Sequence, residues 1–132
     1  MTPDYLDRFG GIGRLYGTAG LQRLHAAHVC VIGIGGVGSW AAEALARSGI
    51  GRITLIDMDD ICVTNTNRQI HAMKGTVGQL KVEAVAERIR LINPECQVEA
   101  RMAFVTTANL EEMISTDMDY VVDCIDSVKN KA

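Results

Sequence analysis

Four short apolar segments recur along the chain, separated by longer stretches of mixed polarity. Residues 28–33 (HVCVIG) and 52–57 (RITLID) are almost continuously apolar, which is typical of strands buried on both faces of a parallel sheet. Residues 119–126 (DYVVDCID) have the same character, whereas residues 97–102 (QVEARM) are more polar. The pattern therefore predicts four strands, with the third strand nearer an edge of the sheet.

Helical periodicity fills the gaps between the predicted strands. A helix follows the first strand and stops at Gly49 and Gly51, because glycine commonly ends a helix. A second helix is predicted over residues 78–93, with Pro94 beyond its end, and a short third helix over residues 107–115. Spacings of three and four residues predict these core-facing side chains: Val37, Trp40, Ala41, Ala44 and Leu45 in the first helix, and Val82, Val85, Ala86, Ile89 and Ile92 in the second.

Strands that alternate with helices in this way predict an α/β fold with right-handed crossovers. We expect a Rossmann-like doubly wound sheet with parallel strands in the order 3-2-1-4, incomplete in this chain because no closing helix follows the fourth strand. The length of 132 residues allows one domain. Residues 1–27 are expected to form a helical lead-in, and residues 28–132 a nucleotide-binding domain truncated at its C-terminal end. Residues 58–75 are expected to form a polar, irregular loop.

Composition narrows the expected compartment and partners. Thirteen basic and sixteen acidic residues give a net charge of −3, which argues against a strongly basic nucleic-acid footprint in this segment. No apolar run reaches the length of about 18 residues that a membrane helix needs, and the N-terminus lacks the apolar core of a secretory signal. The four cysteines lack CxxC spacing, which argues against a zinc knuckle. Reduced cysteines without an export signal favour a cytoplasmic location.

The turn after the first strand carries the most specific chemical signal. Residues 33–38 read GIGGVG, a G-x-G-x-x-G pattern between a predicted strand and a predicted helix. Asp57 ends the second strand at the expected spacing of about 20 residues, where an acid can accept hydrogen bonds from a ribose. The helix N-terminus offers free N–H groups to a phosphate. The sequence thus predicts a nucleotide site formed by Gly33, Gly35, Gly36, Gly38 and Asp57.

Charged and amide side chains around this turn bear on the choice between NAD and ATP. A triphosphate needs cationic side chains and usually a metal ion, whereas the backbone largely holds a dinucleotide pyrophosphate. Arg68 and Lys81 can contact phosphate oxygens, with Asn67 donating beside Arg68. Asp126 ends the fourth strand, where a carboxylate suits a Mg²⁺ shared with phosphate. This set favours ATP, and an NAD-binding oxidoreductase domain remains the weaker alternative.

Two further residues near the same rim have two interpretations each. Cys62 is the cysteine in a polar stretch, and it is either a reactive thiol or a partly buried one. His71 follows Gln69 by two residues, and we interpret it as a structural histidine, with contact to a substrate as the alternative.

Five motifs, in order and in context, resemble the ubiquitin-like-protein-activating superfamily of the ThiF, MoeB and HesA type. The resemblance covers almost the whole chain. Within the superfamily, residues 8–11 (RFGG), 14–17 (RLYG) and 35–47 (GGVGSWAAEALAR) look closest to the bacterial dehydratases that act on threonylcarbamoyladenosine in tRNA. The motifs are Gly33-x-Gly35-Gly36-x-Gly38-Ser39, Asp57-x-Asp59, Asn65-x-Asn67-Arg68-Gln69, Val77-Gly78-x-x-Lys81 and Asp123-x-x-Asp126.

This resemblance implies an enzyme that activates a carboxylate with ATP by adenylation. In the dehydratases, the carboxylate belongs to the threonylcarbamoyl group of a tRNA adenosine, and activation leads to a cyclic, dehydrated nucleoside. The alternative substrate within the superfamily is the C-terminus of a sulfur-carrier or ubiquitin-like protein. By position, the resemblance assigns nucleotide binding to the four glycines with Asp57, Asp59, Asn67, Arg68, Gln69 and Lys81, catalytic roles to Arg68, Lys81 and Asp126, and Mg²⁺ to Asp126.

The resemblance also carries expectations about assembly. Superfamily adenylators often receive an arginine from the N-terminal segment of a partner subunit, so a homodimer is expected. The usual arginine position aligns with Gly11, and Arg14, three residues later, is the candidate for this role, with Arg8 as the other. Any tRNA-binding surface or acceptor groove is expected to lie mostly outside these 132 residues.

Overall fold

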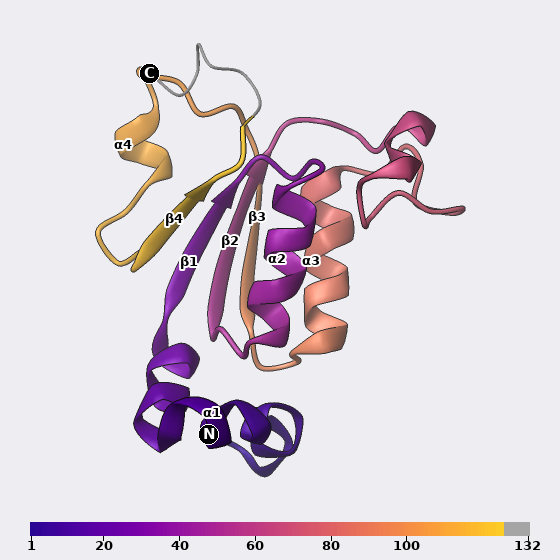
Figure 1. Cartoon of the computed structure of the whole chain (residues 1–132). Coiled ribbons are helices and arrows are strands. Elements are labelled where there is room, and N and C mark those ends of the chain that lie inside the picture. The colour runs from indigo at the N-terminus through magenta and orange to yellow at the C-terminus, as the bar shows by residue number, and fades with distance from the viewer. Residues whose placement is uncertain (126–132) are drawn as a thin grey trace.

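A computed structural model of the chain describes residues 1–125 (Figure 1). Helices and strands alternate along it as the sequence predicts, and one 3₁₀ turn forms within the stretch expected to be an irregular loop. The elements are α1 (Pro3–Ala26), β1 (His28–Ile32), α2 (Gly38–Arg47), β2 (Arg52–Asp57), η1 (Val63–Asn67), α3 (Lys81–Ile92), β3 (Gln97–Met102), α4 (Leu110–Met113) and β4 (Tyr120–Asp123).

The four strands form one parallel sheet in the order β3-β2-β1-β4, which confirms the predicted Rossmann-like order. The predicted edge position of the more polar strand β3 is also confirmed. β1 and β2 occupy the centre, where Val31, Ile53 and Leu55 have no exposed surface. The sheet is not closed in the described part of the chain. Because all strands run the same way, their carboxyl ends meet at one rim of the sheet (Figure 1).

Helices cover the two faces of the sheet unequally. α2 and α3 pack on one face, where Ala42, Val85 and Ile89 join the core formed by the central strands (Figure 1). The other face is covered more thinly by α4 and its flanking loops, which bring Met113 and Ile114 against a smaller buried cluster in β1 and β2. The strand order reverses at β1. Right-handed connections therefore put the first two crossovers, through α2 and α3, on one face and the third, through α4, on the other.

The predicted core stripe of α2 is wrong at Val37, Trp40 and Ala44, which are exposed, whereas Leu45 packs against the core. Val37 and Trp40 are 66% and 52% exposed, whereas Ala42 and Ala46 are fully buried. Gly38 determines this rotation, because it packs directly on Gly33 of the glycine turn and on Cys124 after β4. Small side chains then allow α2 to approach the sheet closely. Periodicity could not separate the two stripes, because alanines occupy positions on both faces of the helix.

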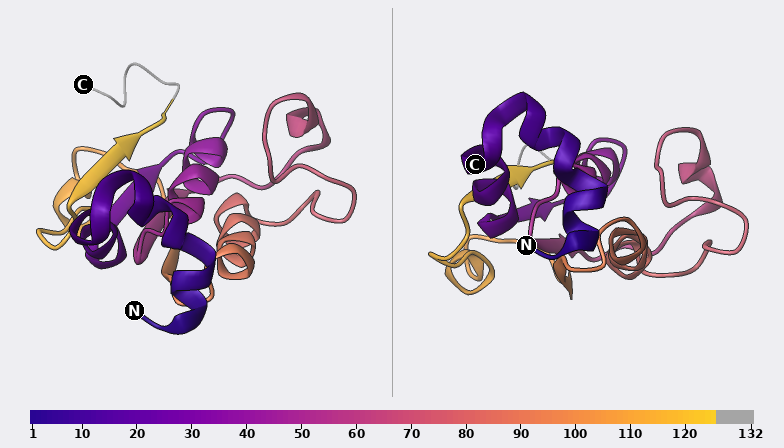
Figure 2. Two further views of the ribbon diagram at one scale, coloured as in Figure 1. Left: turned by 60° about the horizontal axis from the view of Figure 1, so that its bottom comes forward. Right: turned by 90° about the horizontal axis from the view of Figure 1, so that it is seen from below.

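α1 lies across the amino ends of the strands, at the opposite end of the sheet from the glycine turn (Figures 1 and 2). It is kinked at Gly17, which has a φ of 80°, so it consists of two helical stretches as expected. Tyr5 and Phe9 form a buried cluster with Leu21, and the Tyr5 hydroxyl donates to the carbonyl of Gly49 at 2.6 Å. No helix within residues 1–125 is long and apolar enough to cross a membrane.

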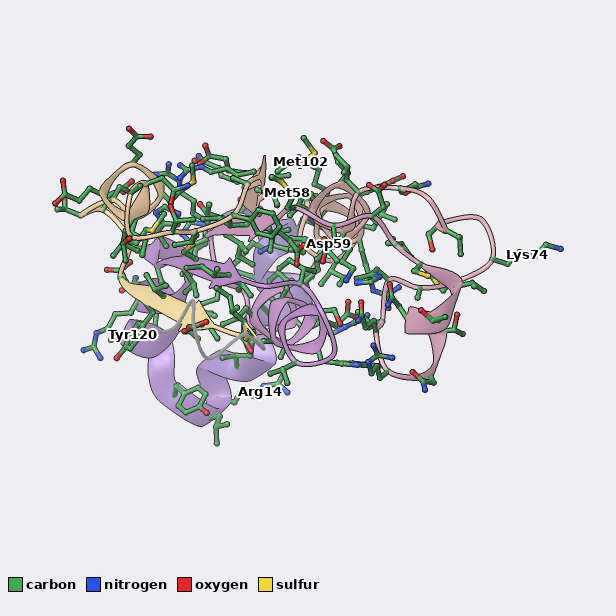
Figure 3. The ribbon with its side chains drawn as sticks, turned by 90° about the horizontal axis from the view of Figure 1, so that it is seen from above. Arg14, Met58, Asp59, Lys74, Met102 and Tyr120 are labelled. Atoms are coloured by element: carbon green, nitrogen blue, oxygen red, sulfur yellow. The ribbon has the colours of Figure 1, made fainter. Side chains whose placement is uncertain are left out.

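Residues 58–80 leave the sheet and return to it as an excursion between β2 and α3. Figure 3 shows Lys74 at its far tip, well away from the strands. The base of the excursion is closed by an antiparallel bridge between Asp60 and Leu80, and the Ile61 N–H donates to the carbonyl of Gln79 at 2.8 Å. The excursion delays α3 to Lys81, three residues later than predicted, because Leu80 is still extended.

Candidate nucleotide site

An open cavity of about 250 Å³ lies at the carboxyl rim of the sheet. Its walls come from the turn after β1, the end of β2, the residues after β3 and β4, and the start of α3. This is the point where the strand order reverses, and ligands of open α/β sheets bind in that crevice. The predicted site residues that line the cavity are Gly33, Gly35, Asp57, Asp59, Gln69 and Lys81.

Packing within the protein requires the first and last glycines of the turn. Gly33 has a φ of 88°, which side chains rarely adopt, and a Cβ there would lie 2.9 Å from the carbonyl oxygen of Cys124. A Cβ on Gly38 would lie 1.6 Å from the carbonyl oxygen of Gly33. These two positions therefore exclude any side chain, whatever the ligand.

The two middle glycines have no such requirement. Around Gly35 and Gly36, the nearest protein atoms would lie 3.6 Å from an added Cβ, which is an ordinary contact. The protein itself leaves room there that a methyl group would fill. A backbone that is free of side chains beside an open cavity and before a helix suits close approach by phosphate oxygens.

Asp57 connects the end of β2 to the glycine turn. Its Oδ2 accepts the backbone N–H of Ile34 at 2.6 Å, and its Oδ1 accepts that of Asp59 at 2.8 Å. An ionised carboxylate has about four acceptor sites, so two remain for a ligand hydroxyl pair. The geometry is therefore compatible with a ribose contact, although the carboxylate also shapes the turn.

Lys81 is the first residue of α3, and its side chain is only 7% exposed. Its backbone N–H donates to the carbonyl of Asp59 at 3.1 Å, which joins the start of α3 to the end of β2. The excursion thus returns Lys81 to the rim beside Asp57 and Asp59. A buried lysine needs compensating negative charge. A phosphate group in the cavity would add such charge to that of Asp57 and Asp59.

The excursion carries Asn67, Arg68 and Gln69, of which only Gln69 lines the cavity. Gln69 is 7% exposed and has no hydrogen-bond partner for its Oε1 within residues 1–125. Arg68 does not line the cavity; its guanidinium donates to the Thr64 carbonyl at 3.2 Å and to Asn67 Oδ1 at 2.9 Å. The Arg68 side chain nevertheless passes next to Gly36, so a change of rotamer would bring its charge to the turn.

The apolar wall of the cavity was missed by the sequence analysis. Ala103, Phe104 and Val105 follow β3, and Met58 follows Asp57 at the end of β2. Figure 3 shows Met58 and Asp59 close to Met102 at the ends of these two strands. The available signal was an apolar triplet at the carboxyl end of a predicted strand, at the same rim as the glycine turn. Such a wall suits a flat apolar ring.

Arg14 does not line the cavity, and Asp126 lies outside the described residues. Arg14 lies on α1, which Figure 1 shows at the opposite end of the sheet from the glycine turn. Residues 1–125 contain no cluster of three or more His, Cys, Asp or Glu side chains that could hold a metal ion. The metal assignment to Asp126 therefore stays a prediction.

Cys62 and His71 differ in environment. Cys62 is exposed, and a hydrogen bond from the Thr64 hydroxyl lowers the pKa of its thiol. His71 is 2% exposed, and burial lowers its pKa, so the ring is neutral near pH 7. Its Nε2 lies 2.9 Å from the carbonyl oxygen of Ile34, a contact that fits the structural interpretation.

Comparison with known proteins agrees with this fold. Residues 11–132 match the model of the ThiF family, and the chain belongs to that family. It is 61% identical over 129 residues to the tRNA threonylcarbamoyladenosine dehydratase of Haemophilus influenzae, covering 98% of this chain and 49% of the relative. It is 64% identical over 125 residues to the Escherichia coli enzyme, covering 95% of this chain and 47% of the relative.

Solved structures give the same picture. The crystal structure of the E. coli tRNA N6-threonylcarbamoyladenosine dehydratase in complex with ATP superposes with a TM-score of 0.97 at 61% identity, covering 98% of this chain and 54% of that one. The same enzyme in complex with AMP gives the same score. The chain thus spans about half the length of the relatives that it matches.

Proposed function

We propose that the chain is the ATP-binding part of a tRNA threonylcarbamoyladenosine dehydratase. The observation that carries the proposal is the cavity lined by Gly35, where the protein leaves room for phosphate against bare backbone. Its support from relatives is the 61% identity to an E. coli enzyme crystallised with ATP. In this role the cavity would take the adenosine against its apolar wall and the phosphates along the glycine turn.

Each predicted residue has a physical role in this proposal. Asp57 would accept the ribose hydroxyls, and Lys81 would neutralise phosphate charge as a point cation. Arg68 would turn from Asn67 to form paired hydrogen bonds with phosphate oxygens, and Gln69 would donate beside it. These groups stabilise negative charge that grows on the leaving pyrophosphate, so none of them has to act as a nucleophile.

The proposed reaction has two stages. The carboxylate of the threonylcarbamoyl group attacks the α-phosphorus of ATP, which forms an acyl adenylate and releases pyrophosphate. A nucleophilic group of the modified nucleoside then attacks the activated acyl carbon, gives up its proton to solvent, closes a ring and expels AMP. One carboxylate oxygen leaves on AMP, so the nucleoside loses one water overall.

A magnesium ion would stabilise the charge of the triphosphate and of the pyrophosphate that leaves. We assign Asp126 as its protein ligand. Asp57 and Asp59 line the cavity, and carboxylate oxygens are the ligands that Mg²⁺ prefers.

We also propose that the protein acts as a homodimer in the cytoplasm. In that assembly, Arg14 of one subunit would reach the site of the other, since α1 lies at the opposite end of the sheet from the glycine turn of its own chain. The tRNA would bind mainly through parts of the protein outside these residues, since the segment itself carries a net charge of −3.

The second candidate function is activation of a sulfur-carrier or ubiquitin-like protein. It is favoured by 36% identity over 109 residues to the molybdopterin-synthase adenylyltransferase of E. coli. The same ATP site would serve both functions, because either substrate presents a carboxylate to the α-phosphate. The identity to the tRNA enzymes is much higher, so the dehydratase is our first choice.

Two measurements on the full-length protein test these proposals. ATP with Mg²⁺ should raise the melting temperature and NADH should not; ligand at about 100 times its Kd stabilises by about 2.7 kcal/mol. The opposite ranking would instead support an NAD-binding oxidoreductase. Incubation with ATP and tRNA that bears threonylcarbamoyladenosine should then remove one water mass from the nucleoside. An unchanged nucleoside, together with pyrophosphate exchange driven by a carrier protein, would support the second candidate.

A further inference from the structure

Three hydrogen bonds attach residues 68–71 to the start of α2 and the glycine turn. The indole N–H of Trp40 donates to the carbonyl of Arg68 at 3.0 Å. The Ile70 N–H donates to Ser39 Oγ at 3.3 Å, and Ser39 Oγ in turn donates to the carbonyl of Gly35. The third bond joins His71 to Ile34. We call residues 68–71 the docked segment.

The His71 bond defines the state of its ring. A carbonyl oxygen can only accept, so Nε2 carries the hydrogen that it donates to Ile34. Nδ1 is then an acceptor, and no partner lies within hydrogen-bond distance of it among residues 1–125. The Nε2 hydrogen bond therefore joins the docked segment to the glycine turn through the carbonyl of Ile34.

The docked segment places two predicted ligand residues against the middle glycines. An added Cβ on Gly36 would lie 3.6 Å from Cγ and Cδ of Arg68, and one on Gly35 would lie 3.6 Å from Nε2 of Gln69. Neither Trp40 nor His71 lines the cavity. The Trp40 indole contacts the backbone of Arg68, and the His71 ring contacts the backbone of Ile34 in the glycine turn.

We propose that Trp40 and His71 are positioning residues that hold Arg68 and Gln69 at the turn for the outer phosphates of ATP. The inference rests on the proposed function of the cavity. Arg68 and Gln69 lie beside the turn at Gly35 and Gly36, where the phosphates would bind, so their placement matters for a triphosphate. AMP lacks the β- and γ-phosphates, and its affinity should depend little on the docked segment.

The test compares the dissociation constants of ATP and AMP, measured by calorimetry on the full-length protein. Trp40→Phe keeps an aromatic ring and removes the N–H donor. His71→Leu removes the donor to Ile34, and His71→Gln restores an N–H near the same place. Loss of one such hydrogen bond is worth about 0.5–1.5 kcal/mol, which corresponds to roughly a 2- to 12-fold change in Kd.

Trp40→Phe and His71→Leu should raise the Kd for ATP by that factor, and change the Kd for AMP by less than about twofold. His71→Gln should recover most of the loss. Leu91→Ala, an exposed apolar change on α3, is the control and should leave both constants unchanged. Trp40 is half-exposed, whereas His71 is buried. Trp40→Phe should therefore fold even where His71→Leu does not.

Two results would overturn the inference while leaving the proposed function in place. One is unchanged ATP affinity in Trp40→Phe and His71→Leu, and the other is an equal loss for ATP and AMP, which a general disturbance of the fold would cause. If the unaltered protein binds neither nucleotide, the proposed function and this inference both fail.

Discussion

The carboxylate of Asp57 lies 2.6 Å from the backbone nitrogen of Ile34, so the end of β2 is hydrogen-bonded to the glycine turn that follows β1. The same carboxylate accepts the N–H of Asp59. The Asp57 side chain therefore holds two parts of the cavity lining, the glycine turn and the residues after β2, without a ligand. Its substitution should affect stability as well as nucleotide binding.

Asp57→Asn should lower both the free energy of unfolding and the affinity for ATP. The amide has a single acceptor oxygen, so one of the two backbone N–H groups loses its partner at a cost of about 1–3 kcal/mol. Denaturant unfolding and ATP titration would measure the two effects. Asp60→Asn, which changes an exposed neighbour, is the matched control. Wild-type stability in Asp57→Asn would show that these hydrogen bonds contribute little.

Two glycine substitutions should have opposite consequences. Gly35→Ala should keep the fold, because its methyl group would make only an ordinary contact with Gln69, and it should weaken ATP binding by filling the space beside the turn. Gly38→Ala should disrupt the fold, because its methyl group would overlap the carbonyl oxygen of Gly33. Melting temperature and ATP affinity separate the two. Equal melting temperatures would contradict this packing.

Arg68→Ala should weaken ATP binding by about tenfold or more with the fold intact, because hydrogen bonds to charged groups are worth about 1.5–3 kcal/mol. The Arg68 side chain is exposed and contacts only Asn67 and the Thr64 carbonyl as hydrogen-bond partners within the described residues, so stability should change little. Arg90→Ala, an exposed arginine on α3, controls for net charge. Unchanged ATP affinity in Arg68→Ala would remove its assigned role.

The contact between α2 and α3 should make stability depend on pH. Burial alone would raise the pKa of Glu43, but hydrogen bonds from Arg88 and Arg47 outweigh it and hold the pKa below 4.5. Because the pKa is lower in the folded state, this stabilisation is complete above about pH 4.5 and is lost as the pH falls through the folded-state value. Glu43→Gln should remove that part of the acid dependence in urea unfolding. Parallel curves for variant and wild type would contradict the expectation.

A complementation experiment tests Arg14 as a residue that acts across a dimer. Arg14→Ala and Lys81→Ala should each abolish dehydration when pure. If the arginine acts in trans, mixed subunits contain one site with both residues intact, so mixing the two variants should restore part of the activity. No recovery, with subunit exchange shown separately, would exclude this role for Arg14. Arg8→Ala would then be the next variant to mix.

Local periodicity predicted most of the fold correctly. The apolar runs located all four strands, and the glycine turn between a strand and a helix indicated a nucleotide site at the correct rim. Errors occurred where neighbours distant in sequence decide the outcome. Both faces of α2 carry alanines, so only the contact of Gly38 with the carbonyl of Gly33 could determine which face is buried.

The sequence by itself determined the parallel order of strands, the position of the turn and the identities of the charged residues around it. These follow from local patterns, since burial and turn geometry act over a few residues. Only the tertiary structure decided that Lys81 is buried at the rim of the sheet and that Phe104 and Met58 form the apolar wall of the cavity. It also decided that the Arg68 side chain lies beside Gly36. Such contacts join residues dozens of positions apart, and their geometry depends on how the excursion folds back onto the sheet.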